Sequence, residues 1–164
     1  MKKSITLIGL PGCGKTTIGR LLSEKLNYDF VDMDDYIEEK QGKTIKEIFK
    51  NGEDYFRNIE TDTCEVLGKV SQTIISSGGG IVKKEINISF LKDNSILVFI
   101  DRPVENILSD IEVEKRPLLV NGKEVLYKLY DERYNLYKEY CDYRVENTGS
   151  LEEVVDKIAK LINS

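Results

Sequence analysis

The sequence predicts an α/β sandwich, in which helices cover both faces of a mainly parallel sheet. Residues 73–77 and 96–100 are continuous runs rich in β-branched and apolar side chains, which is typical of strands buried on both faces. Stretches with helical spacing of apolar residues separate these runs, and such alternation favours a doubly wound parallel sheet. Ligands of such sheets bind beyond the carboxyl ends of the strands, so functional residues are expected there.

The elements follow in order along the chain. Residues 4–8 form the first expected strand, residues 30–32 a second short one, and residues 143–145 a weaker fifth. The helix after the first strand is expected from the stripe Ile18, Leu21, Leu22 and Leu26. Ser150 is the expected N-cap of a closing helix. That helix carries the stripe Leu151, Val154, Val155, Ile158 and Ile162.

Two segments depart from the simple alternation, although residues 1–164 are expected to form one domain. Residues 34–70 are expected to be mostly helical, with a break at Asn51-Gly52, and are interpreted as a substrate-binding insertion. The charged residues 110–123 are interpreted as a lid, with a solvated charge run as the alternative.

Composition excludes several functions. The chain contains no histidine, which rules out a histidine base, a nucleophile–histidine pair and any histidine metal site. The formal charge of −5 and the pI near 5.0 argue against a nucleic-acid module. The longest purely apolar run has five residues, whereas a membrane helix needs about 20. Three scattered cysteines suit a reducing compartment, so we expect a cytoplasmic protein.

A phosphate-binding loop lies between the first strand and the first helix. Residues 9–16, GLPGCGKT, match GxxxxGK[ST] in the strand-to-helix context that this motif requires, which predicts a P-loop NTPase-type fold binding ATP. Glycines allow backbone amides to face the phosphates, Lys15 neutralises the β- and γ-phosphates, and Thr16 offers a hydroxyl to Mg²⁺. The alternative is a tight turn without a ligand. The expected nucleotide contacts are Gly12, Cys13, Gly14, Lys15, Thr16 and Thr17.

Paired aspartates end the second strand. Strand alternation would turn Asp32 and Asp34 to one side and Met33 to the other, which places two carboxylates in one cleft. A nucleotide-bound Mg²⁺ would offset their repulsion, with Asp32 near the metal and Asp34 accepting a hydroxyl proton. The alternative is an acidic helix N-terminus, to which we assign Asp35.

Two arginines lie in unusual places. Arg133 falls on the apolar stripe of its helix, and a buried arginine requires an anion. Arg57 has Glu60 three positions later, so it is either an ordinary surface pair or a functional residue. If the two arginines converge, they would hold a carboxylate by bidentate hydrogen bonds.

Two further segments point to the same edge of the sheet. Arg116 in the expected lid would stabilise charge on the transferring phosphoryl group. Gly78, Gly79 and Gly80 directly follow the third strand, where they would allow close backbone approach to a ligand. A flexible turn is the competing interpretation of this triplet.

Taken together, six segments resemble the shikimate kinase family in order and spacing. They are GLPGCGKTT from residue 9, FVDMDD from 30, YFR from 55, SGGG from 77, KRPLL from 115 and ERYNLY from 132. The resemblance implies transfer of the γ-phosphoryl group of ATP to the 3-hydroxyl of shikimate, which gives 3-phosphoshikimate for chorismate and aromatic amino acid biosynthesis. It also implies a five-stranded parallel sheet in the order 2-3-1-4-5.

The resemblance also implies roles for individual residues. Lys15 and Arg116 would act on the phosphates, Thr16 and Asp32 would serve Mg²⁺, and Asp34 would be the base. The residues that would hold shikimate are Asp34, Arg57, Gly79, Gly80 and Arg133. The partners expected are ATP and shikimate, for a chain that acts as a monomer, without nucleic acid or membrane.

The sequence departs from the family pattern near the adenine. Asp110 and Ile111 stand where members commonly carry an arginine, so Arg102 or residues 147–150 are candidate adenine contacts. The usual proline after the second shikimate arginine is absent from Tyr134-Asn135.

Two other functions remain open from the residues. One is a kinase for gluconate, another small metabolite or a nucleoside monophosphate. The other is a nucleotide-dependent switch without an acceptor, for which the chain lacks the NKxD signature of guanine recognition.

Overall fold

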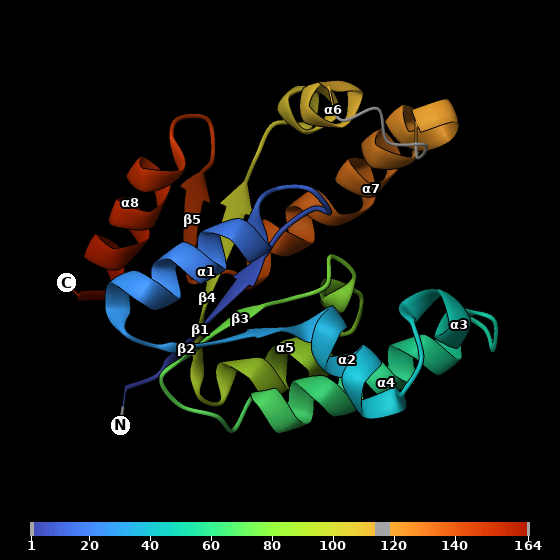
Figure 1. Cartoon of the computed structure of the whole chain (residues 1–164), viewed down its shortest axis with the longest axis horizontal. Helices are drawn as coiled ribbons and strands as arrows, with labels where there is room; N and C mark the ends of the chain where they lie inside the picture. Colours follow the sequence, from blue (N-terminus) through green and yellow to red (C-terminus); the bar gives the residue numbers. More distant parts are fainter. Residues whose placement is uncertain (1, 114–118, 164) are drawn as a thin grey trace.

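The computed structural model describes residues 2–113 and 119–163, and its centre is a five-stranded parallel sheet (Figure 1). The strands are β1 (Ser4–Ile8), β2 (Asp29–Asp32), β3 (Thr73–Ser76), β4 (Ser95–Asp101) and β5 (Tyr143–Glu146). Their order is β2-β3-β1-β4-β5, which confirms the expected topology. The chain runs from β1 to β2 on one side of the sheet and later from β4 to β5 on the other. The loop after β1 therefore lies at the switch point where sheets of this kind bind ligands.

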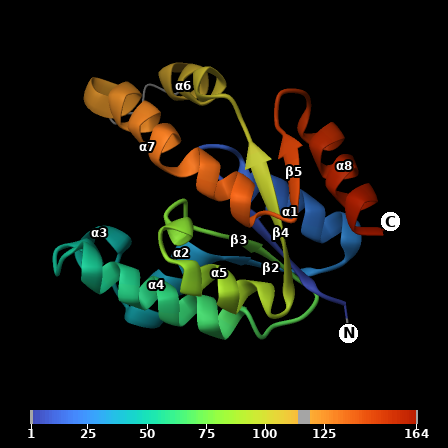
Figure 2. The same cartoon turned by 180° about the vertical axis from the view of Figure 1, so that it is seen from behind.

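Helices form a layer on each face of the sheet. On one face lie α1 (Lys15–Leu26) and α8 (Leu151–Asn163), which also pack against each other. On the other lie α5 (Glu85–Lys92) and α7 (Leu119–Tyr140), and both contact β4 (Figure 2). This arrangement confirms the three-layer sandwich.

The two irregular segments lie at the carboxyl edge of the sheet. The expected insertion forms α2 (Met33–Gln41), α3 (Ile45–Phe49) and α4 (Glu53–Leu67), and the helices break at residues 50–52 as expected. The ends of the expected lid belong to α6 (Val104–Val113) and to α7. Arg116, with the rest of residues 114–118, lies outside the described residues.

The burial pattern explains why these runs form strands. Every residue of β1 and β3 is buried, because helices cover both sides of the central strands. The edge strand β5 buries only Val145. The closing helix begins at Ser150 as expected, because the Ser150 hydroxyl accepts the Glu153 N–H at 3.2 Å.

Two residues of the predicted helical stripes are exposed. Leu21 and Leu151 are 37% and 39% accessible to solvent. Leu21 is rotated about 100° from its neighbour Leu22, and only Leu22 turns to the sheet. Leu151 starts the first turn of α8, one turn before Val154 and Val155 reach the core. The stripes therefore predicted the helices correctly and the buried face too broadly.

No helix within residues 2–113 and 119–163 combines the length and apolar character that crossing a membrane requires.

Candidate active site

The loop between β1 and α1 has the backbone shape of a phosphate cradle. Gly12 and Gly14 adopt left-handed conformations, with φ of 81° and 103°, which side chains other than glycine rarely tolerate. The Lys15 ammonium is buried and donates to the carbonyl oxygens of Gly9 at 2.6 Å and Leu10 at 3.0 Å. The N-terminus of α1 directs its positive end into the same loop. These features make an anion site.

Two side chains hold this loop from outside. Arg102, which forms an ion pair with Asp110, donates from Nη1 to the Gly12 carbonyl at 3.1 Å. Asn147 donates from Nδ2 to the Cys13 carbonyl at 2.9 Å and is itself buried. Both residues were candidate adenine contacts, and the structure places both against the loop. The Cys13 side chain is also buried, so its thiol does not face the open side of the loop.

The two aspartates meet in a different way from the one predicted. Strand β2 ends at Asp32, which is the N-cap of α2, so Asp34 lies in the first turn of a helix rather than on a strand. The alternation argument was therefore wrong. Met33, which it turned away from the two carboxylates, is fully buried. The acidic helix N-terminus that we weighed as the alternative is present, and Asp35 belongs to it.

Asp32 connects the two helix starts. Its Oδ2 accepts the Thr16 hydroxyl at 2.8 Å, and its Oδ1 accepts the Asp35 N–H at 3.1 Å. The Thr16 oxygen also lies 3.1 Å from Ser76 Oγ at the end of β3. Sequence analysis does not single out Ser76, because a lone serine at a strand end is common.

Asp34 is the titratable group at the centre of the site. Crowding by protein atoms raises the pKa of Asp34, and the neighbouring Asp32 carboxylate adds to the increase, while Lys15 opposes it. Asp34 remains accessible to solvent at the same time. A raised pKa makes this carboxylate a better proton acceptor than an ordinary aspartate.

The three glycines after β3 are each covered by a different part of the site. A Cβ on Gly78 would lie 3.0 Å from Glu60 Oε2 and 3.5 Å from Asp34 Oδ1. A Cβ on Gly79 would lie 3.4 Å from Arg133 Nη1, and one on Gly80 would lie 2.7 Å from Arg57 Cζ. None of the three has a positive φ, so a left-handed backbone is not the reason for glycine here. The reason is the close approach of neighbouring side chains to the backbone.

Arg57 is held by acids on its own helix. Its Nη1 lies 2.9 Å from Glu60 Oε1, and its Nε lies 3.4 Å from Glu53 Oε1. Glu60 is 1% exposed, so this contact is not the surface pair that we weighed as an alternative. Burial raises the pKa of Glu60, and the Arg57 charge opposes that rise. Glu60 was missed as a site residue because its spacing from Arg57 suits an ordinary helix pair equally well.

Arg133 approaches Gly79 from α7. Its burial is confirmed at 7% exposure, and its Nε is buried with no hydrogen-bond partner among the described residues. One turn further on, the fully buried Tyr137 donates its hydroxyl to the Gly79 carbonyl at 2.6 Å. Tyr137 also packs against Phe99, with the two ring centroids 5.1 Å apart.

The oxygen ligands at the mouth of the loop fit a magnesium ion. Thr16 and Asp32 offer a hydroxyl and a carboxylate side by side, and Mg²⁺ takes few protein ligands when phosphates and water complete its shell. No cluster of three or more His, Cys, Asp or Glu side chains that could hold a metal by itself is found within the described part of the chain.

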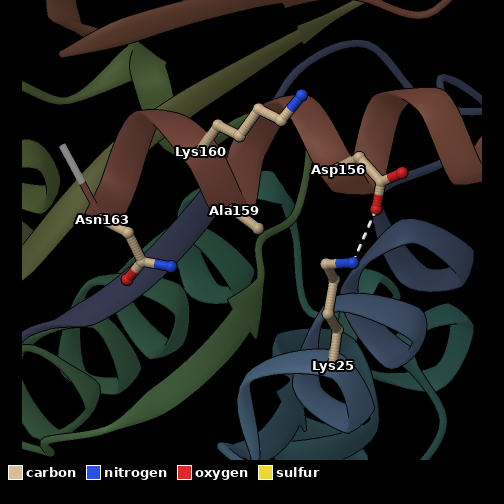
Figure 3. A pocket seen from close by; sticks show the side chains of 5 residues that line it. All are labelled: Lys25, Asp156, Ala159, Lys160 and Asn163. Carbon is tan, nitrogen blue, oxygen red and sulfur yellow. Dashed lines mark hydrogen bonds and ion pairs between the residues drawn. The ribbon is translucent and has the colours of Figure 1, made fainter.

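A separate surface hollow lies at the opposite end of α1. Lys25, Asp156, Ala159, Lys160 and Asn163 line it, and an ion pair of 2.6 Å joins Lys25 to Asp156 across it (Figure 3). The phosphate loop ends in the first turn of α1, whereas this hollow lies beside the last turn, about 15 Å away along the helix. The hollow is therefore not part of the site.

The fold and the site together define a P-loop kinase for a small molecule. A family model described as "Shikimate kinase" matches residues 11–163. A shikimate kinase from Clostridium botulinum is 54% identical over 162 residues, which cover 99% of this chain and 98% of that protein. The chain belongs to the shikimate kinase family.

Solved structures agree with this assignment. A shikimate kinase from Acinetobacter baumannii, solved in complex with shikimate, superposes with a TM-score of 0.90 at 38% identity, covering 99% of this chain and 94% of that one. A gluconokinase from Sinorhizobium meliloti superposes with a TM-score of 0.64 at 16% identity, covering 98% and 94% of the two chains. The second likeness shows the fold alone.

Proposed function

We propose that this chain transfers the γ-phosphoryl group of ATP to the 3-hydroxyl of shikimate and so makes 3-phosphoshikimate for aromatic amino acid biosynthesis. One observation carries the choice of acceptor. Arg57, Arg133 and Asp34, from three different helices, all border the glycine triplet beside the phosphate loop. Two cations and one proton acceptor match a molecule that bears a carboxylate and a hydroxyl.

The phosphate loop holds the triphosphate. The backbone amides of Gly12 and of residues 14–17, at the start of α1, surround the phosphates, whereas the Cys13 N–H donates to the Leu10 carbonyl. Lys15 lies within the loop and exchanges its carbonyl partners for phosphate oxygens when ATP binds. This exchange keeps the ammonium paired in both states, so its burial costs little.

Thr16 and Asp32 would hold Mg²⁺, with Asp32 acting through water. Such an ion would neutralise charge on the β- and γ-phosphates. Ser76 Oγ lies against Thr16 and keeps the hydroxyl at the carboxyl end of β3.

Asp34 acts as the general base. The acceptor hydroxyl gives its proton to Asp34 as its oxygen forms a bond to the γ-phosphorus, and the bond from that phosphorus to the bridging oxygen breaks to release ADP. Because the pKa of Asp34 is raised, kcat is expected to fall as pH decreases through that raised pKa.

Arg57 and Arg133 bind the acceptor carboxylate, while the backbones of Gly79 and Gly80 lie against its ring. The Arg133 Nε, which is buried without a partner in the described structure, gains an acceptor in this way. Glu60 holds Arg57 in place, since its carboxylate lies 2.9 Å from Nη1.

Residues 110–123 act as a lid that carries Arg116 to the transferring phosphoryl group. A cation there stabilises negative charge in the transition state, and closure excludes water that would hydrolyse ATP. ATP hydrolysis in the absence of acceptor is therefore expected to be slow.

The test is an ADP-release assay over a panel of acceptors at fixed ATP and Mg²⁺. Shikimate is expected to give the highest kcat/KM, with quinate, gluconate and nucleoside monophosphates well below it. A higher kcat/KM with gluconate or a nucleotide would assign a different kinase, and ADP release independent of every acceptor would assign a switch.

One chain supplies every group of the proposed site, so we also propose that it acts as a monomer. The three cysteines are free thiols, which supports a cytoplasmic location. Light scattering of the purified chain tests the first proposal, and a mass near 18.8 kDa is expected.

A further inference from the structure

Two neighbouring peptide groups of the phosphate loop are held in different ways. In the peptide between Gly12 and Cys13, the carbonyl accepts from Arg102 and the Cys13 N–H donates to the Leu10 carbonyl at 3.1 Å. Both groups of this peptide are therefore engaged within the protein. In the next peptide, the Cys13 carbonyl accepts from Asn147, whereas no hydrogen bond of the Gly14 N–H to the described residues is found.

The geometry of a trans peptide links these two groups. The C=O and the N–H of one planar trans peptide point in opposite directions. A hydrogen bond that fixes the Cys13 carbonyl toward Asn147, directly after β5, therefore fixes the Gly14 N–H in the opposite direction. Gly14 is also the N-cap of α1, so its N–H belongs to the set that receives a phosphate.

Asn147 is itself firmly placed. It follows β5, its backbone N–H donates to the Asp101 carbonyl at 2.8 Å, and its residue is 7% exposed. Its Nδ2 lies 3.0 Å from the position that a Cβ on Gly14 would occupy. Glycine at position 14 and asparagine at position 147 therefore fit each other, 133 residues apart.

We infer that Asn147 is a positioning residue for phosphoryl transfer, which orients the Gly14 N–H toward the β-phosphate through the Cys13 carbonyl. The inference rests on the proposed binding of ATP by this loop. It also gives Asn147 a different role from the adenine contact that the sequence suggested, because the buried amide is occupied by the loop.

The test compares Asn147→Ala with Asn94→Ala. Asn94 also donates from Nδ2, to the Val70 carbonyl at 2.9 Å and to Ser71 Oγ at 2.8 Å. It directly precedes β4 and so lies at the amino ends of the strands, whereas the phosphate loop lies at the carboxyl ends. Both variants lose side-chain hydrogen bonds to backbone carbonyls, buried at Asn147 and partly buried at Asn94, so both are expected to lose stability. Only a loop-positioning role predicts a difference in nucleotide binding.

For Asn147→Ala we expect the Kd for ADP and the inhibition constant of inorganic tripolyphosphate both to rise about tenfold, the cost of one buried carbonyl left without its donor. The Kd for shikimate alone is expected to stay unchanged. For Asn94→Ala all three constants are expected to stay unchanged while the Tm falls. Asn147→Leu, which keeps the volume and adds no charge, repeats the test if the alanine variant does not fold.

Three results would overturn the inference. An unchanged Kd for ADP in both Asn147 variants would remove the positioning role. A loss for ADP without a loss for tripolyphosphate would make Asn147 an adenine contact instead. An equal loss in Asn94→Ala would make the effect one of general stability. Failure of the unaltered chain to bind ADP would overturn the proposed function as well, so the two failures are distinguishable.

Discussion

The two halves of the site are built on opposite plans. The phosphate side is one continuous stretch of eight residues, and its binding groups are mainly backbone amides whose direction is set by left-handed glycines. The acceptor side gathers single charged side chains from α2, α4 and α7 around three glycines. The phosphate side can be recognised in the sequence as a motif, because its residues are contiguous. The acceptor side cannot, because its side chains come together only when the helices pack.

The largest expected effect is on the acceptor side, at the base. Asp34→Asn removes the proton acceptor and keeps the size of the side chain, so kcat is expected to fall by about 10² or more. ATP binding is expected to persist, because the phosphate side is untouched. Stopped-flow measurement of turnover with parallel ADP titrations checks both points. Unchanged turnover would remove the assigned role.

Arg133→Lys is the next in size. Lysine keeps the charge but lacks the fork that binds a carboxylate with two hydrogen bonds, so the KM for shikimate is expected to rise about tenfold with little change for ATP. The matched control is Arg20→Lys, an exposed arginine that lies over the Phe30 ring. Equal losses for both substrates would point to damage to the fold rather than to one half of the site.

A smaller effect concerns stability at the same base. The folded state raises the pKa of Asp34 above its ordinary 3.8, so it favours the neutral form. The resulting contribution to the free energy of unfolding is fully present below pH 3.8 and is lost as pH rises through the raised pKa. Asp34→Asn is therefore expected to raise the Tm at pH 7 by at most about 2 °C, since Asp34 is exposed, with no gain below pH 3.8. Thermal melts of both proteins between pH 3 and pH 7 test this prediction. A lower Tm for the variant at pH 7 would contradict it.

The smallest effect lies outside both halves. Lys25→Met removes an ion pair with Asp156 whose side chains are 47% and 53% exposed, and such pairs contribute about 0–1 kcal/mol. Neither kcat nor either KM is expected to change. A change in activity would mean that the hollow between α1 and α8 communicates with the site.

Much of the fold could be predicted because the central strands are buried runs rich in apolar side chains, separated by stretches with helical spacing. The phosphate loop, the three layers and the break near Asn51 all depend on local sequence, and the structure agrees with each. The order of the strands came only from the family resemblance, since periodicity carries no information about which strands are neighbours.

Less of the acceptor side was accessible to sequence reasoning. The burial of Arg133 followed from its stripe, but the depth of Glu60 depends on the packing of α4 against other helices and has no local signature. The aspartate pair was placed on a strand because alternation ignored the N-cap preference of Asp32. That preference was present in the sequence and would have given the observed helix start.

The bifurcated role of the Asp32 carboxylate has a mechanical consequence. One oxygen anchors the first turn of the helix that follows the phosphate loop, and the other anchors the first turn of the helix that bears Asp34. A shift of either helix turn would strain the hydrogen bond to the other. The phosphate side and the acceptor side of the site are therefore mechanically coupled at Asp32. The relative position of the phosphate loop and Asp34 therefore depends on the two hydrogen bonds that the Asp32 carboxylate accepts.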